Sequence, residues 1–152
     1  MSNKVCLWGL WISTIAVVLI AALQGLSGNW VTFFLIWPGT PGLQPAFIRA
    51  MVILASYHRI AGFIVGAISI LILFFAFLSK SSIYVRIFAV AGFVMTALAA
   101  VGGFLYVTSG LQDRWSLGQM ADAFVGVLGV YLIQLFFMNK TPRFPWVRAK
   151  AN

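Results

Sequence analysis

The sequence has very little charge, almost no acid, and only one histidine and one cysteine. Of its 152 residues, 8% are charged and two are acidic. Soluble globular domains average about 25% charged residues, so this composition excludes them. A lone Cys6 cannot form an internal disulfide, and we expect it to be inert. One histidine and one cysteine also cannot build the metal-ligand clusters or nucleophile–base pairs of soluble-style enzymes.

Apolar residues make up 62% of the chain, and the mean hydropathy is +1.03. A helix needs about 20 mostly apolar residues to cross a bilayer. Four runs meet this length, at about residues 5–26, 47–78, 83–107 and 117–138. The predicted fold class is therefore all-α: an integral membrane four-helix bundle, with residues 1–152 forming a single transmembrane domain. All five prolines lie outside these runs, which disfavours a transporter built on discontinuous helices.

A loop separates the first two predicted spans, and the second span is unusually long. Residues 27–46 are rich in Gly, Pro and Trp, which indicates an outer loop or short interfacial segment. The run at 47–78 exceeds the thickness of a bilayer, so we expect it to tilt or to start in the headgroup layer. A cleaved signal peptide is an alternative interpretation of the first span, but signal-peptide cores run to only about 7–15 apolar residues.

Lys and Arg gather on one side of the predicted bundle. Cytoplasmic loops of membrane proteins hold the excess of these residues, which predicts that both termini are cytoplasmic (N-in/C-in) in a multi-pass protein of the plasma membrane. Residues 139–152 would form a basic cytoplasmic tail, attracted to anionic lipid. No aromatic-interleaved basic patch is present, so the expected partner is the lipid bilayer and not nucleic acid. The seven basic residues on that side are Lys4, Lys80, Arg86, Lys140, Arg143, Arg148 and Lys150.

Few ionisable groups lie inside the spans, and each costs several kcal/mol unless it has a partner or a task. His58 and Arg59 are on the second span and Asp122 is on the fourth. Helix rise counted from Met51 places His58 roughly 10 Å below the outer surface, and Asp122 enters to a similar depth. We therefore expect the outer half of the bundle to be polar.

The only histidine allows two interpretations. His58 could be an axial ligand of heme iron, with Arg59 as the partner of a heme propionate. Alternatively, His58 hydrogen-bonds across helices while Arg59 reaches the headgroups or pairs with Asp122. Gly62 and Gly66 follow His58 at four-residue spacing, and a flat macrocycle or a neighbouring helix could use the space they leave.

Several short motifs, in order along most of the chain, resemble the heme A synthases. This family has eight-helix members made of two fused four-helix halves, and also compact four-helix forms. The resemblance implies heme ligation by a His-Arg pair on the second helix. The similar stretches are residues 24–28 (Gln-Gly-Leu-Ser-Gly), Trp37-Pro38, Tyr57-His58-Arg59, Gly102-Gly103 and residues 109–111 (Ser-Gly-Leu).

The sequence departs from this family at two positions. The family's active half has a glutamate three residues before the histidine, where this chain has Ala55, and its fourth helix supplies a second histidine, where this chain has Gln119-Met120. His58 with Met120 could still ligate one heme, whereas Gln119 is a poor iron ligand that would line the site. No catalytic residue is expected.

These departures favour a non-catalytic accessory or heme-binding subunit of a respiratory terminal oxidase assembly, working with other membrane subunits and holding one heme or none. A compact heme A synthase that acts as a homo-oligomer, or a heme-free structural scaffold, are the alternatives.

Overall fold

The computed structural model describes residues 3–36, 45–110 and 114–140. These residues form four helices, α1 (Asn3–Ile36), α2 (Pro45–Leu78), α3 (Ile83–Thr108) and α4 (Arg114–Lys140). No strand occurs within these ranges. The all-α prediction is confirmed, and three of the four spans begin and end within three residues of the predicted limits.

The first helix differs from the prediction. The outer loop expected at 27–46 is wrong for residues 27–36, because α1 continues to Ile36. Gly28 alone costs a helix only about 1 kcal/mol, and residues 30–36 are mostly apolar and contain neither Gly nor Pro. At the other side of the loop, Pro45 is the first residue of α2, where its fixed φ suits a helix and its missing N–H is not needed.

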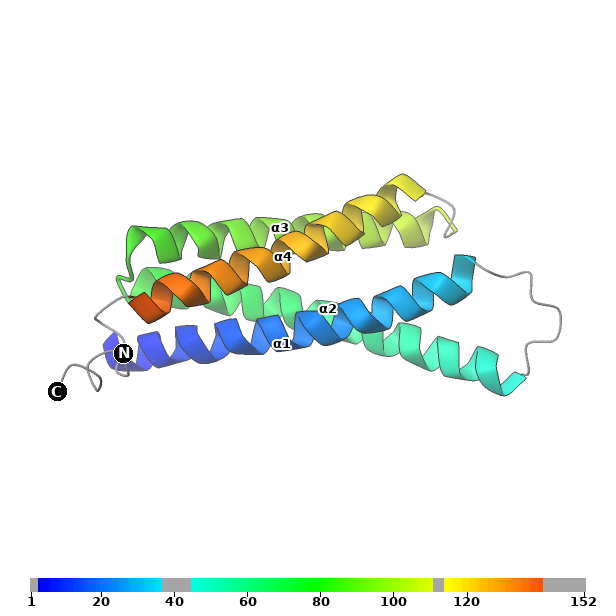
Figure 1. Cartoon of the computed structure of the whole chain (residues 1–152), viewed down its shortest axis with the longest axis horizontal. Helices are drawn as coiled ribbons and strands as arrows, with labels where there is room; N and C mark the ends of the chain where they lie inside the picture. The colour runs from blue at the N-terminus through cyan, green and yellow to red at the C-terminus, as the bar shows by residue number, and fades with distance from the viewer. Residues whose placement is uncertain (1–2, 37–44, 111–113, 141–152) are drawn as a thin grey trace.

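The helices pack as two antiparallel pairs. α1 packs mainly against α2, and α3 mainly against α4; α2 with α3 and α1 with α4 join the pairs. Figure 1 shows the pairs close together at the end where α1 begins and α4 ends, which we call the closed end. The pairs diverge toward the opposite end, which we call the diverging end. The described basic tail residue Lys140 lies with its ammonium 4.6 Å from the centre of the Phe136 ring, whereas residues 141–152 lie outside the described part of the chain.

Close contacts at glycines and aromatic rings hold the pairs together. The Phe75 ring of α2 lies on Gly9 of α1, and the Phe124 ring of α4 lies on Gly25 of α1. At the closed end, Phe137 of α4 stacks with both Tyr84 and Phe88 of α3, with ring centres 5.2 and 5.4 Å away. The core between the helices is mostly apolar, and includes Leu10, Val17, Ile72, Val85, Val127 and Tyr131.

The outside of the bundle is also apolar. Phe63, Phe104 and Val125, for example, are 75%, 68% and 68% exposed. Each of the four helices is long and apolar enough to cross a membrane. Apolar surfaces this extensive are the rule for helices in lipid and rare in water. The chain therefore has the build of a multi-pass membrane protein.

Candidate functional site

The imidazole of His58 is held against α1 in the diverging half of the bundle. Its Nδ1 atom lies 3.1 Å from the backbone carbonyl of Gln24 and 3.4 Å from the Ser27 hydroxyl. The ring also lies directly on Gly28, where an added Cβ would come 2.7 Å from the His58 ring carbon Cε1. His58 therefore occupies a fitted position between the two helices.

The side chain of Gln24 on α1 also contacts α2. Its side-chain amide donates to the backbone carbonyl of His58 at 3.4 Å, and its Nε2 covers Gly62, 3.0 Å from a Cβ built there. Ser27 donates to the Gln24 carbonyl at 2.9 Å. The cluster requires α1 to stay helical beyond Leu26, which is the point where the sequence-based span ended.

The hydrogen bond at Nδ1 defines what the imidazole can do. A carbonyl oxygen can only accept, so the contact with Gln24 is a hydrogen bond when Nδ1 carries the proton, and in the neutral ring the lone pair is then on Nε2. Histidines that ligate metals usually have this arrangement, with the second ring nitrogen donating to a carbonyl or carboxylate. His58 thus combines the interhelical hydrogen bond of one sequence interpretation with the free nitrogen that the other requires.

Arg59 and Asp122 are not brought together. Both side chains are exposed, and neither has an ion pair or hydrogen bond within residues 3–36, 45–110 and 114–140. Arg59 is one residue beyond His58 and so points about 100° away around the helix. The pairing of Arg59 with Asp122, one of the alternatives that the sequence offers for Arg59, is therefore absent from these residues.

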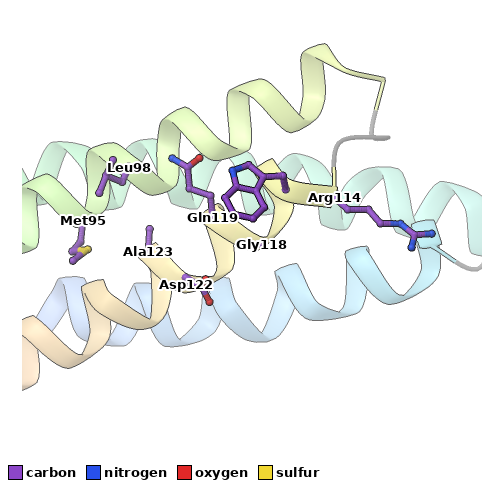
Figure 2. Close-up of a pocket in the computed structure, with 8 residues that line it drawn as sticks. Met95, Leu98, Arg114, Gly118, Gln119, Asp122 and Ala123 are labelled. Atoms are coloured by element: carbon purple, nitrogen blue, oxygen red, sulfur yellow. The ribbon is translucent and has the colours of Figure 1, made fainter.

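Gln119 and Asp122 line a groove between α3 and α4. The groove has a volume of about 470 Å³. In Figure 2, Met95 and Leu98 line it from α3, while Arg114, Gln119 and Asp122 lie along α4. The polar residues thus sit on one apolar-walled groove near the start of α4.

Met120 packs against α3. Its sulfur would be 3.2 Å from a Cβ at Gly103, and its backbone nitrogen 3.0 Å from a Cβ at Gly102. The Gly102-Gly103 pair that the sequence analysis names is therefore a place where the backbones of α3 and α4 approach closely. His58, in contrast, makes its contacts with α1.

A buried polar layer in the middle of the bundle was not predicted as a site. The hydroxyls of Ser69 on α2 and Thr96 on α3 lie 3.1 Å apart, and the Tyr131 hydroxyl of α4 lies beside them without a hydrogen bond of standard geometry. Gln134 is fully buried, and neither atom of its amide has a partner in the described residues. Ser69, Thr96 and Gln134 are isolated polar residues in separate apolar runs, and nothing in their spacing indicates that they lie in one layer of the bundle.

Within the described residues, no three His, Cys, Asp or Glu side chains lie close enough to hold a metal ion. No protein-family model, curated protein or solved structure matches the chain. The resemblance to the heme A synthases stays a prediction, and the site rests on the geometry of His58.

Proposed function

We propose that this protein is a non-catalytic, heme-binding accessory subunit of a respiratory terminal oxidase assembly in the plasma membrane. The observation that supports the proposal is the Nδ1 hydrogen bond from His58 to the Gln24 carbonyl. It leaves Nε2 as the only strong nitrogen ligand of the chain, within an apolar bundle where neutral imidazole is favoured.

The surrounding residues fit one axial ligand. The Gln24 carbonyl fixes the tautomer and orientation of the ring, and Gly28 leaves the ring room beside α1. A bound heme would supply one-electron chemistry. Because Met120 lies against Gly103 and Ala55 has no carboxyl group, the residues support binding through His58 alone better than the oxidation of a heme methyl group.

The orientation proposed is that both termini face the cytoplasm. Lys4, Lys80 and Lys140 lie at or next to helix ends at the closed end of the bundle. Arg86 lies there too, one turn into α3, where its Nε donates to the Ser81 carbonyl at 3.1 Å. The excess of basic residues at one end supports a cytoplasmic position for that end.

A pyridine hemochrome spectrum tests the proposal, measured on protein purified from the membranes of cells that make their own heme. We expect about one heme per chain, and loss of the Soret band in His58→Ala. Tyr57→Phe changes an exposed neighbour and serves as the matched control, which should keep the spectrum. Met120→Leu should also keep it, since Met120 contacts α3. Heme-free protein, or an unchanged spectrum in His58→Ala, would overturn the proposal.

A further inference from the structure

Two opposite charges in the outer half of the bundle have no ion pair or hydrogen bond among the described residues. Arg59 on α2 and Asp122 on α4 are both exposed, and Asp122 is the only acidic residue among those described. An ionised side chain within a transmembrane helix is costly unless it has a partner or reaches water. Charged side chains in transmembrane helices usually pair with an opposite charge or another polar group.

The two charges lie at the same depth. Ser69 on α2 and Tyr131 on α4 share one level of the core, because the Tyr131 hydroxyl lies beside Ser69. Arg59 is ten residues outward from Ser69 and Asp122 is nine residues outward from Tyr131, which is about 15 and 14 Å of helix. Copies of a membrane protein related by rotation about the bilayer normal keep every residue at its depth. Matched depth is therefore what an ion pair between two copies requires.

Open glycines accompany both charges at the same spacing. Gly66 follows Arg59 by seven residues, and Gly129 follows Asp122 by seven; a Cβ at either glycine would meet nothing within 4 Å. Seven residues are two turns, so each glycine shares a helix face with its charge. Gly118, four residues before Asp122, is equally open. Small residues on a face let two transmembrane helices approach closely.

The direction of the helices brings the two faces into register. α2 and α4 both begin at the diverging end of the bundle and run toward the closed end (Figure 1). When α2 of one copy lies beside α4 of the next, the helices are parallel, so Arg59 meets Asp122 and Gly66 meets Gly129 two turns further in.

Arg114 is the other described cation near Asp122, and both line the groove between α3 and α4. Arg114 is the first residue of α4 and lies eight residues away, about 12 Å along the helix. It forms no ion pair with Asp122 in the structure. The carboxylate is thus available to a group that arrives from outside.

We infer that the α4 face of Asp122, Gly118 and Gly129 binds the α2 face of Arg59 and Gly66 on a second copy of this chain, with an Arg59–Asp122 ion pair between the copies. The contact joins two different faces, so each copy can bind two neighbours and assemblies larger than a dimer form. This inference is independent of heme binding.

Disulfide trapping in the native membrane tests the contact. Two differently tagged copies are expressed together, both with Cys6→Ser, one with Gly66→Cys and the other with Gly129→Cys. The new side chains enter open space, so both variants should fold. Under a mild copper–phenanthroline oxidant we expect a mixed dimer, and little product when either variant is expressed alone. Absence of the mixed dimer, or equal self-linking of the two variants, would overturn the inference.

Charge variants placed on chosen copies test the ion pair. Arg59→Asp on the copy with Gly66→Cys should lower the mixed dimer by at least about tenfold, since it replaces the ion pair by two carboxylates that repel each other. Adding Asp122→Arg to the copy with Gly129→Cys should restore it. The control is Lys140→Gln on the copy with Gly66→Cys, which removes a charge at the other end of α4, outside the proposed contact, and should change nothing. Failure of the double swap to restore the dimer would contradict the pairing.

Discussion

The aromatic ring of Tyr131 on α4 lies against the backbone of Gly92 on α3, where a Cβ atom would stand 2.5 Å from Tyr131 Cζ. Tyr131 is fully buried, and its hydroxyl lies beside the Ser69–Thr96 pair. One side chain therefore brings α2, α3 and α4 together at the middle of the bundle.

Gly92→Ala should destabilise the bundle by about 1–3 kcal/mol, because the added methyl group overlaps the ring of the fully buried Tyr131. Gly66→Ala, measured on monomeric protein in detergent, is the control, since its methyl group enters open space within one copy. Unfolding of the two variants in mixed detergent micelles measures the difference. Tyr131→Leu should remove most of the cost of Gly92→Ala in a double-mutant cycle; equal costs in both backgrounds would contradict the contact.

The buried amide of Gln134 leads to a second prediction, of the opposite sign. Neither its oxygen nor its nitrogen has a hydrogen-bond partner in the described residues, and the side chain is fully buried. Replacing a buried polar group without partners by an apolar group of similar size removes its desolvation cost, about 1–3 kcal/mol. Gln134→Leu should therefore stabilise the protein.

The same unfolding assay measures this effect. Gln134→Glu, which keeps the size and worsens the desolvation, is the matched control and should destabilise the protein. A loss of stability in Gln134→Leu would mean that the amide is satisfied by a group such as a buried water molecule.

The helices could be predicted from the sequence because length and hydropathy alone determine a transmembrane span. The predictions at 83–107 and 117–138 fall within three residues of α3 and α4. The end of α1 could not be predicted, because the glycine and tryptophan content of residues 27–46 indicates a loop while the helix-breaking residue, Pro38, comes ten residues after Gly28.

The site was predictable only in part. His58 stands out in the sequence because it is the only histidine, and helix rise predicts that His58 and Asp122 lie in the same half of the bundle. Which neighbour each residue contacts depends on how the four helices are rotated, and apolar residues on every side of each helix leave that rotation undefined. Neither the contact of Met120 with Gly103 nor that of His58 with Gly28 could be derived from spacing alone.

The asymmetry of Lys and Arg predicts the topology. Reporter fusions near Gly39 and Ser109 should report the outside, and fusions near Ser81 and at the C-terminus should report the cytoplasm. Paired alkaline phosphatase and green fluorescent protein fusions at each position measure this directly. A cytoplasmic signal at Gly39 would reverse the orientation proposed, without affecting the bundle itself.

Gly28→Ala should displace the imidazole of His58. The added Cβ would come 2.7 Å from Cε1 and 3.2 Å from Nδ1, so the ring must move away from α1 and weaken its hydrogen bond to the Gln24 carbonyl. We expect a loss of stability of about 1–2 kcal/mol, from overpacking and one hydrogen bond. In protein purified with heme, the same change should lower the heme content, because an axial ligand with a free tautomer and orientation binds iron less well.

A His58→Ala background separates the packing effect from the heme effect. Without the ring there is nothing for the new methyl group to meet, so Gly28→Ala should then cost no more than Gly66→Ala does. Unfolding of heme-free protein gives this comparison whether or not heme binds in the cell. Gly28→Ala could instead cost as much stability without the His58 ring as with it. That result would mean that the His58 ring does not pack on Gly28. It would also contradict the orientation of Nε2 on which the heme proposal depends.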